Sequence, residues 1–334
     1  MALTPRSVIV TGGAGYIGTH VVHALLDAGY RVHVLDDLST GRAQLVASGV
    51  PLWVANVRDR PQVKKLLGES GAASVIHLAA SIRIDESVER PLDYYQNNVC
   101  ASRALFQTCV EAGVEHFVFS STAAVYGEVP PEPVAESHPA SPISPYGSTK
   151  LAVEWMLRDV ARAHGSRHVA LRFFNVAGAD PALRTGATHE SSGHLISTAC
   201  QVARGVRESL TIFGDDYSTP DGTPVRDFIH VADIASAHVA ALQHLEQGGQ
   251  SEVLNLGYGR GFSVQEVVDS VRRISGHAVP VQRGPRRPGD AAKVIANVDR
   301  IRETLGWVPQ HASLDVIIET TLRWQSRWTG LRES

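Results

Sequence analysis

Short apolar runs alternate with longer amphipathic stretches through the first half of the chain, and this alternation most constrains its fold. Six runs have the composition of strands: Ser7–Val10, Val32–Leu35, Leu52–Ala55, Ser74–His77, Phe117–Ser120 and Val169–Phe173. All but the third are largely apolar, which is typical of strands covered on both faces of a parallel sheet. The stretches expected to be helical are Ile17–Ala28, Pro61–Glu69, Pro91–Ala112 and Tyr146–His164. This order predicts an α/β fold with a doubly wound parallel sheet.

The second half of the chain is less regular. Three loop-rich stretches interrupt two expected helices, Val231–Leu245 and Val264–Ile274. We therefore expect residues 1–178 to form the sheet domain, a segment at about residues 231–258 to return to it, and residues 179–334 to form mainly a smaller C-terminal lobe.

Composition narrows the function classes. Among 334 residues, 43% are hydrophobic and 19% charged, as in a soluble globular protein. The formal charge of −3 gives no electrostatic reason to expect nucleic acid or a membrane as partner, and we see neither a signal peptide nor a membrane-spanning run. Cys100, Cys109 and Cys200 form no CxxC pair and no metal-ligand spacing. They indicate reduced thiols, a cytoplasmic location and no metal site.

A glycine-rich turn, TGGAGYIG at residues 11–18, directly follows the first expected strand and opens the first helix. Glycines at this junction let backbone N–H groups approach a diphosphate at the helix N-terminus. Asp36 ends the second strand about 20 residues further on, where an acid binds ribose hydroxyls in Rossmann-type domains. Asp36 and Asp37 would repel a 2′-phosphate, so the sequence favours NAD over NADP.

The heptapeptide SPYGSTK at residues 144–150 places Tyr146 and Lys150 on one helix face. An ammonium group near a phenol favours the phenolate, so Lys150 is expected to lower the pKa of Tyr146. A tyrosine tuned in this way can take a proton from a sugar hydroxyl. Thr122, just past the fifth strand, lies where ligands bind in such sheets and supplies a third hydroxyl.

These motifs together resemble the extended short-chain dehydrogenase/reductase superfamily. Four longer stretches, FSSTAAVYGE, PLDYYQNNV, RFFNVAGA and FGDDYSTPDGTPVRDFIHVADIA, closely resemble UDP-glucose 4-epimerases. The similarity runs over nearly the whole chain. It implies an isomerase that interconverts UDP-glucose and UDP-galactose at C4 through a transient 4-keto sugar, with tightly bound NAD regenerated in each cycle. Relatives are commonly homodimers through two helices, here Pro91–Ala112 and Tyr146–His164.

The resemblance also assigns site residues. The catalytic group would be Tyr146 as acid and base, Lys150 and Thr122. The cofactor-binding group would be Gly12, Gly15, Tyr16, Ile17, Gly18, Asp36, Asp37, Asn56, Val57, Leu78, Asn98, Tyr146, Lys150 and Phe173. The substrate-binding group would be Thr122, Asn175, His194, Leu195, Phe213, Arg226, Arg287, Asp290 and Val294, with Phe213 flanking the uracil and the arginines at the diphosphate.

This sequence departs from the family pattern in a few places. Asn56 stands where many relatives have Asp near the adenine. Arg83 and Asp85 replace small or apolar residues beside the nicotinamide, and the Ala179–Gly193 loop matches weakly. Val294 stands where a bulky tyrosine excludes an N-acetyl group in some relatives, so UDP-GlcNAc and UDP-GalNAc become candidate substrates.

Rival functions differ in the chemistry that they need. Sugar-nucleotide 4,6-dehydratases carry an Asp-Glu pair right after the threonine, and UDP-glucuronate decarboxylases keep a Glu there; this chain has Ala123 and Ala124. A UDP-glucuronate 4-epimerase remains an alternative, as does a non-catalytic NAD-binding regulator. His20 and His23 lack a carboxylate cluster for metal binding, and His77 is interpreted as a packed, hydrogen-bonded histidine.

Overall fold

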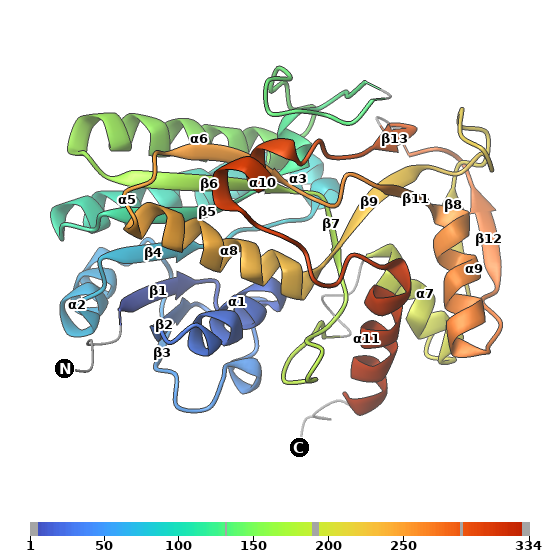
Figure 1. The fold of residues 1–334 in the computed structure, drawn as a ribbon, viewed down its shortest axis with the longest axis horizontal. Helices are drawn as coiled ribbons and strands as arrows, with labels where there is room; N and C mark the ends of the chain where they lie inside the picture. Colours follow the sequence, from blue (N-terminus) through green and yellow to red (C-terminus); the bar gives the residue numbers. More distant parts are fainter. Residues whose placement is uncertain (1–5, 131, 189–193, 288–289, 329–334) are drawn as a thin grey trace.

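A seven-stranded parallel sheet forms the centre of the computed structural model, which describes residues 6–130, 132–188, 194–287 and 290–328 (Figure 1). The strand order is β10-β6-β5-β4-β1-β2-β3. The bounds are β1 (Ser7–Thr11), β2 (Arg31–Asp36), β3 (Leu52–Val54), β4 (Ser74–His77), β5 (His116–Thr122), β6 (Arg167–Phe173) and β10 (Glu252–Leu256). The predicted doubly wound fold is confirmed, and the six predicted strands agree with β1 to β6 to within two residues at either end.

Burial explains the composition of these strands. Every residue of β4 and β5 is buried, because helices cover both faces of the sheet. β3 lies at the edge, where Val54 is 62% exposed. Its weaker apolar character in the sequence therefore reflects its place at the margin of the sheet.

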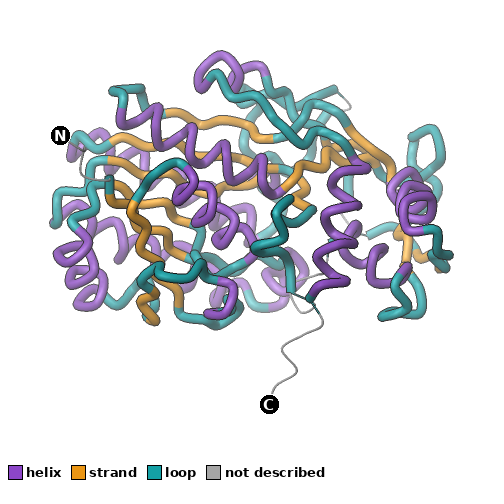
Figure 2. The backbone as a smooth tube through the Cα atoms, turned by 60° about the horizontal axis from the view of Figure 1, so that its bottom comes forward, coloured by secondary structure: helices purple, strands orange, loops and turns teal. Residues whose placement is uncertain are grey.

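Two helix layers flank the sheet. On one face, α1 (Tyr16–Asp27) packs against α8 (Val231–Glu246) over a core that includes Val10, Val21 and Leu242. On the other face, α2 (Arg60–Ser70), α5 (Ala101–Glu111) and α6 (Pro145–His164) enclose a second core. Figure 2 shows the strands running side by side behind the helices that face the viewer.

One predicted helix contains an irregularity. The stretch expected as a single helix at Pro91–Ala112 begins as α4 (Pro91–Tyr94), widens into a π-helical turn at Tyr95–Cys100, and continues as α5. The short helix α3 (Ile84–Glu89) precedes it. A π-turn moves side chains off the regular 3.6-residue spacing, and such turns occur frequently at functional sites.

The C-terminal half adds smaller units around this sheet. β7 (Asn175–Ala177), β9 (Val225–His230), β11 (Gly261–Ser263) and β13 (Lys293–Val294) form one sheet, and β8 (Leu210–Phe213) pairs with β12 (Val281–Gly284). Their helices are α7 (Leu195–Ala203), α9 (Val264–Ser275), α10 (Asp299–Leu305) and α11 (Leu314–Arg327). The chain returns at α8 and β10, which pairs with β6. The proposed division into residues 1–178 and 179–334 stays a prediction. None of the helices described here has the length and apolarity needed to cross a bilayer.

Candidate active site

The glycine turn at the carboxyl end of β1 is packed too tightly for side chains. Gly12 has φ +69°, and a Cβ atom there would lie 2.6 Å from the backbone nitrogen of Ala79. A Cβ on Gly18 would lie 2.0 Å from the carbonyl oxygen of Gly12. Gly15 is the N-cap of α1, and no side chain caps it. Its first-turn N–H groups, at Tyr16, Ile17 and Gly18, therefore suit a diphosphate.

Asp36, the acid at the end of β2, is hydrogen-bonded to the glycine turn. The Asp36 carboxylate accepts hydrogen bonds from the backbone N–H groups of Ala14 and Leu38, both at 2.9 Å. Asp37 accepts a 2.8 Å hydrogen bond from the side-chain amide of Asn56. An aspartate at position 56 would place a second carboxylate against Asp37, so asparagine gives this site a hydrogen-bond donor. Val57 is buried directly beyond it. This arrangement fits the adenosine end of NAD.

Tyr146, Thr122 and Lys150 meet at the carboxyl end of β5. Ser144 caps α6 by accepting from the Gly147 N–H at 3.2 Å, which begins the helix one residue before Tyr146. The Thr122 hydroxyl lies close enough to the Tyr146 phenol to favour its ionised form. The Lys150 ammonium donates to the carbonyl oxygen of Ser120 at 2.9 Å and lies 6.0 Å from the centre of the Tyr146 ring.

The structure does not show the lowered pKa that was expected for Tyr146. Burial raises the pKa of Tyr146 to about 12, and the Thr122 hydroxyl opposes this only in part. Burial also lowers the pKa of Lys150 to about 7, against the attraction of Glu154. The ammonium is directed toward a backbone carbonyl rather than the phenol, so the four-residue spacing alone does not produce an acidic tyrosine.

Asn98 occupies the π-turn, and the protein itself uses its amide. Its side-chain oxygen accepts from the Ser81 N–H at 2.8 Å, and its nitrogen donates to the Ser81 carbonyl at 2.9 Å. The same nitrogen lies 3.1 Å from the Thr149 hydroxyl on α6. Asn98 thus ties the loop after Leu78 to the helix that carries Tyr146. Sequence reasoning expected a direct cofactor contact and missed this positioning role, for which no spacing gives a signal.

A buried hydrogen-bond chain supports the same loop. The Thr11 hydroxyl lies 2.7 Å from Nδ1 of His77, and Nε2 of His77 lies 2.8 Å from the Ser102 hydroxyl. Ser102 in turn donates to the Asn98 carbonyl at 2.5 Å. Burial lowers the pKa of His77 to about 3, so the imidazole is neutral. Its interpretation as a packed, hydrogen-bonded histidine is confirmed.

The candidate substrate residues of the second half form two pairs. Arg287 stacks on Phe213 with 4.1 Å between the guanidinium carbon and the ring centre. Arg226 forms an ion pair with Asp290, and β-sheet pairing places Val294 beside Arg226. The structure therefore brings together residues predicted from distant segments: Phe213 on β8 meets Arg287, and Arg226 on β9 meets Asp290 and, on β13, Val294.

The remaining predicted residues lie on other strands, helices and loops. Phe173 ends β6, and Asn175 begins β7 with an exposed side chain. His194 is the N-cap of α7, and Leu195 is its first residue. Arg83 and Asp85 form an exposed ion pair with each other at 2.7 Å. The last five residues of the Ala179–Gly193 loop lie outside the described residues. Within the described ranges, no group of three or more His, Cys, Asp or Glu residues could hold a metal ion.

Comparison with known proteins agrees with this geometry. Residues 8–257 match the model of the NAD dependent epimerase/dehydratase family. The chain is 52% identical to a UDP-glucose 4-epimerase of Azospirillum brasilense, over 97% of this chain and 93% of that protein. It superposes with a TM-score of 0.93 on the UDP-glucose 4-epimerase of Brucella ovis in complex with NAD, at 41% identity over 95% and 98% of the two chains. A UDP-Glc/GlcNAc 4-epimerase of Campylobacter jejuni gives a TM-score of 0.84 at 41% identity, over 96% and 99%.

The glycine turn with Asp36, the grouped Thr122, Tyr146 and Lys150, and these similarities over nearly the whole chain lead to one assignment. The chain belongs to the NAD dependent epimerase/dehydratase family.

Proposed function

We propose that this protein interconverts UDP-glucose and UDP-galactose by inverting the configuration at C4. The observation that carries the proposal is the meeting of Tyr146, Thr122 and Lys150 at the sheet edge that also bears the glycine turn. The residues Ala123 and Ala124 after Thr122 provide no acid or base for dehydration. The chemistry supported is therefore proton transfer coupled to oxidation and reduction at a single carbon.

The chain's own residues supply the proton transfer. NAD, when bound, supplies a reversible acceptor for the C4 hydride and a positive charge on its oxidised ring. Tyr146 takes the proton of the 4-hydroxyl group and returns it when the 4-keto sugar is reduced on its other face. Thr122 shares its hydrogen bond with Tyr146 and with the reacting oxygen. Lys150, held by the Ser120 carbonyl, binds the nicotinamide ribose.

The second half would hold the nucleotide while the hexose turns. Arg226 and Arg287 offer planar guanidinium groups for diphosphate oxygens, and Phe213 offers a flat surface for uracil. Asn175 lies exposed at the start of β7, between these side chains and the sheet. Because the substrate is held by its diphosphate rather than by its sugar, the hexose can turn and present either face of C4 to NAD.

We also propose a broader substrate range that includes UDP-GlcNAc and UDP-GalNAc. Val294 is half-buried next to Arg226 and carries neither a ring nor a hydroxyl group. The volume that a tyrosine would fill is therefore left to a C2 substituent. The similar Campylobacter jejuni protein is described as a UDP-Glc/GlcNAc 4-epimerase.

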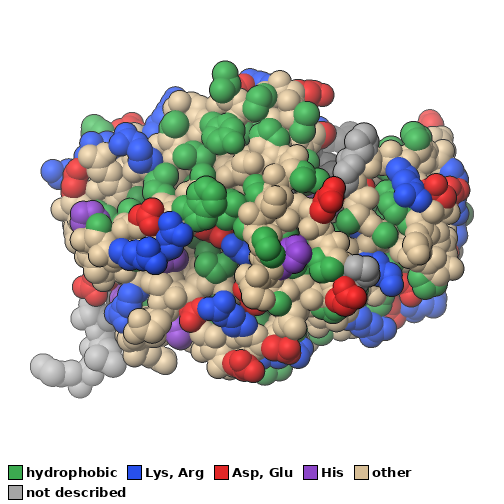
Figure 3. Space-filling view, turned by 90° about the horizontal axis from the view of Figure 1, so that it is seen from above, with side chains coloured by type: hydrophobic (Ala, Val, Ile, Leu, Met, Phe, Trp, Pro, Cys, Tyr) green, Lys and Arg blue, Asp and Glu red, His purple; other side chains and the backbone are tan. Residues whose placement is uncertain are grey.

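The assembly proposed is a homodimer through α5 and α6, located in the cytoplasm. Large apolar side chains are exposed beside these helices, among them Val88, Leu92 and Tyr95. Figure 3, which views the molecule from above, shows hydrophobic side chains gathered across that face. Cys100, Cys109 and Cys200 are all free thiols, in keeping with a reducing compartment.

The direct test is to incubate the purified protein with UDP-galactose without added cofactor. We expect UDP-glucose to accumulate until equilibrium, because NAD copurifies and is regenerated. Conversion that requires added NADP, or that yields a dehydrated or decarboxylated sugar, would contradict the proposal. Sedimentation or light scattering of the same sample tests the dimer.

A further inference from the structure

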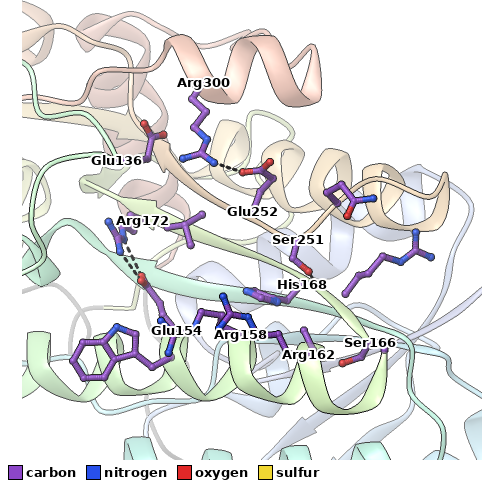
Figure 4. Close-up of a pocket in the computed structure, with 16 residues that line it drawn as sticks. Glu136, Glu154, Arg158, Arg162, Ser166, His168, Arg172, Ser251, Glu252 and Arg300 are labelled. Carbon is purple, nitrogen blue, oxygen red and sulfur yellow. Dashed lines mark hydrogen bonds and ion pairs between the residues drawn. The ribbon is translucent and has the colours of Figure 1, made fainter.

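A groove of about 660 Å³ lies between α6 and β10, the edge strand of the central sheet (Figure 4). One wall is the second half of α6, and the other is formed by β6, from Arg167 to Arg172, and the first residues of β10, with Arg300 of α10. The glycine turn, Thr122 and the other candidate site residues lie at the carboxyl edge of the sheet. None of them lines this groove. Its volume is in the range of small-molecule sites.

The groove carries an excess of positive charge. Its lining contains five arginines and three glutamates: Arg158, Arg162, Arg167, Arg172 and Arg300, with Glu136, Glu154 and Glu252. Three of the arginines are paired: Arg172 with Glu154 at 2.6 Å and Arg300 with Glu252 at 2.5 Å within the groove, and Arg158 with the neighbouring Asp159 at 3.0 Å. Figure 4 shows the first two pairs at one end of the groove, away from Arg162 and Ser166.

The other end has unused hydrogen-bonding capacity. Arg162 makes no ion pair or hydrogen bond with the described residues, and Arg167 contacts only the neutral ring nitrogen of His116, at 3.2 Å. His168 lines the groove with 5% of its surface exposed, and its Nδ1 atom is buried without a partner. A buried polar atom without a partner is costly unless a water or ligand satisfies it.

We propose that this groove binds a small phosphorylated molecule at a site separate from the UDP-sugar site. Arg162 and Arg167 would contact the phosphate oxygens, since guanidinium groups match phosphate in charge and hydrogen-bond geometry. Burial keeps His168 neutral, with its pKa lowered to about 4, so its ring offers a single N–H donor. The Ser166 hydroxyl and the Gln250 amide are available for the uncharged remainder of the ligand, and the Ser251 hydroxyl, which accepts from the backbone N–H of His168 at 3.0 Å, can still donate.

The experiment titrates inorganic pyrophosphate into the holoenzyme by calorimetry, with UDP present at saturation to fill the substrate site. We expect one saturable site in the wild type. Removing one charged hydrogen-bonding partner in Arg162→Gln is expected to weaken binding about tenfold. The matched control is Arg323→Gln, because Arg323 is exposed on α11 far from the lining residues.

Comparing the two variants shows whether pyrophosphate binds in the groove, independently of UDP in the substrate site. Arg162 lies outside the proposed catalytic and substrate groups, so Arg162→Gln is expected to keep wild-type turnover and thermal stability. Absence of saturable pyrophosphate binding overturns the proposal, as does equal loss in Arg162→Gln and Arg323→Gln. Malonate serves as a dicarboxylate comparison: binding as tight as that of pyrophosphate would overturn the assignment to phosphate.

Discussion

The sheet half and the C-terminal half of the molecule each contain an ion pair, and the two pairs differ in how far they are buried. Beside the sheet, Glu154 and Arg172 form an ion pair whose side chains are only 4% and 8% exposed, next to the buried Lys150. In the second half, Arg286 and Asp216 pair in the open, at 47% and 70% exposure. A buried pair is costly to separate, whereas an exposed pair contributes little and exchanges partners readily. The pair in the sheet half therefore holds its geometry rigidly, whereas the pair in the C-terminal half can exchange partners.

The largest effect is expected at the centre of the sheet half. Tyr146→Phe removes the group that transfers the proton, so we expect kcat to fall by about 10²–10⁴-fold. The melting temperature and NAD content should stay unchanged because the ring still fills its site. A rate within about threefold of wild type would show that another group is the acid and base.

The difference between the buried and the exposed ion pair can be tested by measuring the free energy of unfolding of two variants. Arg172→Met leaves the Glu154 carboxylate buried without its partner, and we expect the free energy of unfolding to fall by about 3–5 kcal/mol. Arg286→Gln, which breaks an exposed pair, should leave it unchanged within error. Denaturant titration of both variants measures the difference. Equal losses would remove the distinction between the two halves.

The cofactor end of the sheet half gives a smaller effect. Asp36→Asn weakens charge-assisted hydrogen bonding at the end of β2, and we expect NAD affinity to fall by roughly tenfold or more. The preference for NAD over NADP should fall with it. Nucleotide released on denaturation and titration of the apoprotein provide the measurement. Finding NADP in the wild-type protein would contradict the role of Asp36.

The smallest effect is expected in the C-terminal half, at Val294. Val294→Tyr should lower kcat/KM for UDP-GalNAc by about tenfold while leaving UDP-galactose nearly unchanged, since added volume discriminates by about 10–200-fold in a pocket. Steady-state kinetics with both substrates provide the readout. If wild type has no N-acetyl activity, the broader range is wrong; if Val294→Tyr retains that activity in full, Val294 is not the determinant.

The sequence predicts the regions in which local pattern and burial agree. β1, β2 and β4 to β6 are buried on both faces, so their apolar runs are visible without tertiary information. The glycine turn and the Tyr146–Lys150 spacing are equally local. Glu154, four residues after Lys150 on the same helix, follows that spacing and could have been noticed.

Features that depend on contacts between distant segments were not predictable. The return of about residues 231–258 to the sheet domain is expected from the sequence, but β10 itself, a five-residue strand, is recognised only by its pairing with β6. The bonds from Asn98 to Ser81 and Thr149 depend on the π-turn, which an otherwise helical pattern conceals. The raised pKa of Tyr146 reflects burial by surrounding elements, which residue spacing does not report.

The pairing of β10 with β6 has a consequence for synthesis on the ribosome. β6 ends at Phe173, and its neighbour β10 begins only at Glu252. Until that later segment emerges, the nascent chain presents an unpaired strand edge of apolar residues, which is prone to associate with other chains. A fragment that stops at residue 178 would keep this edge permanently. The second half is therefore needed for the first to complete its folding, and the two mature together as one unit.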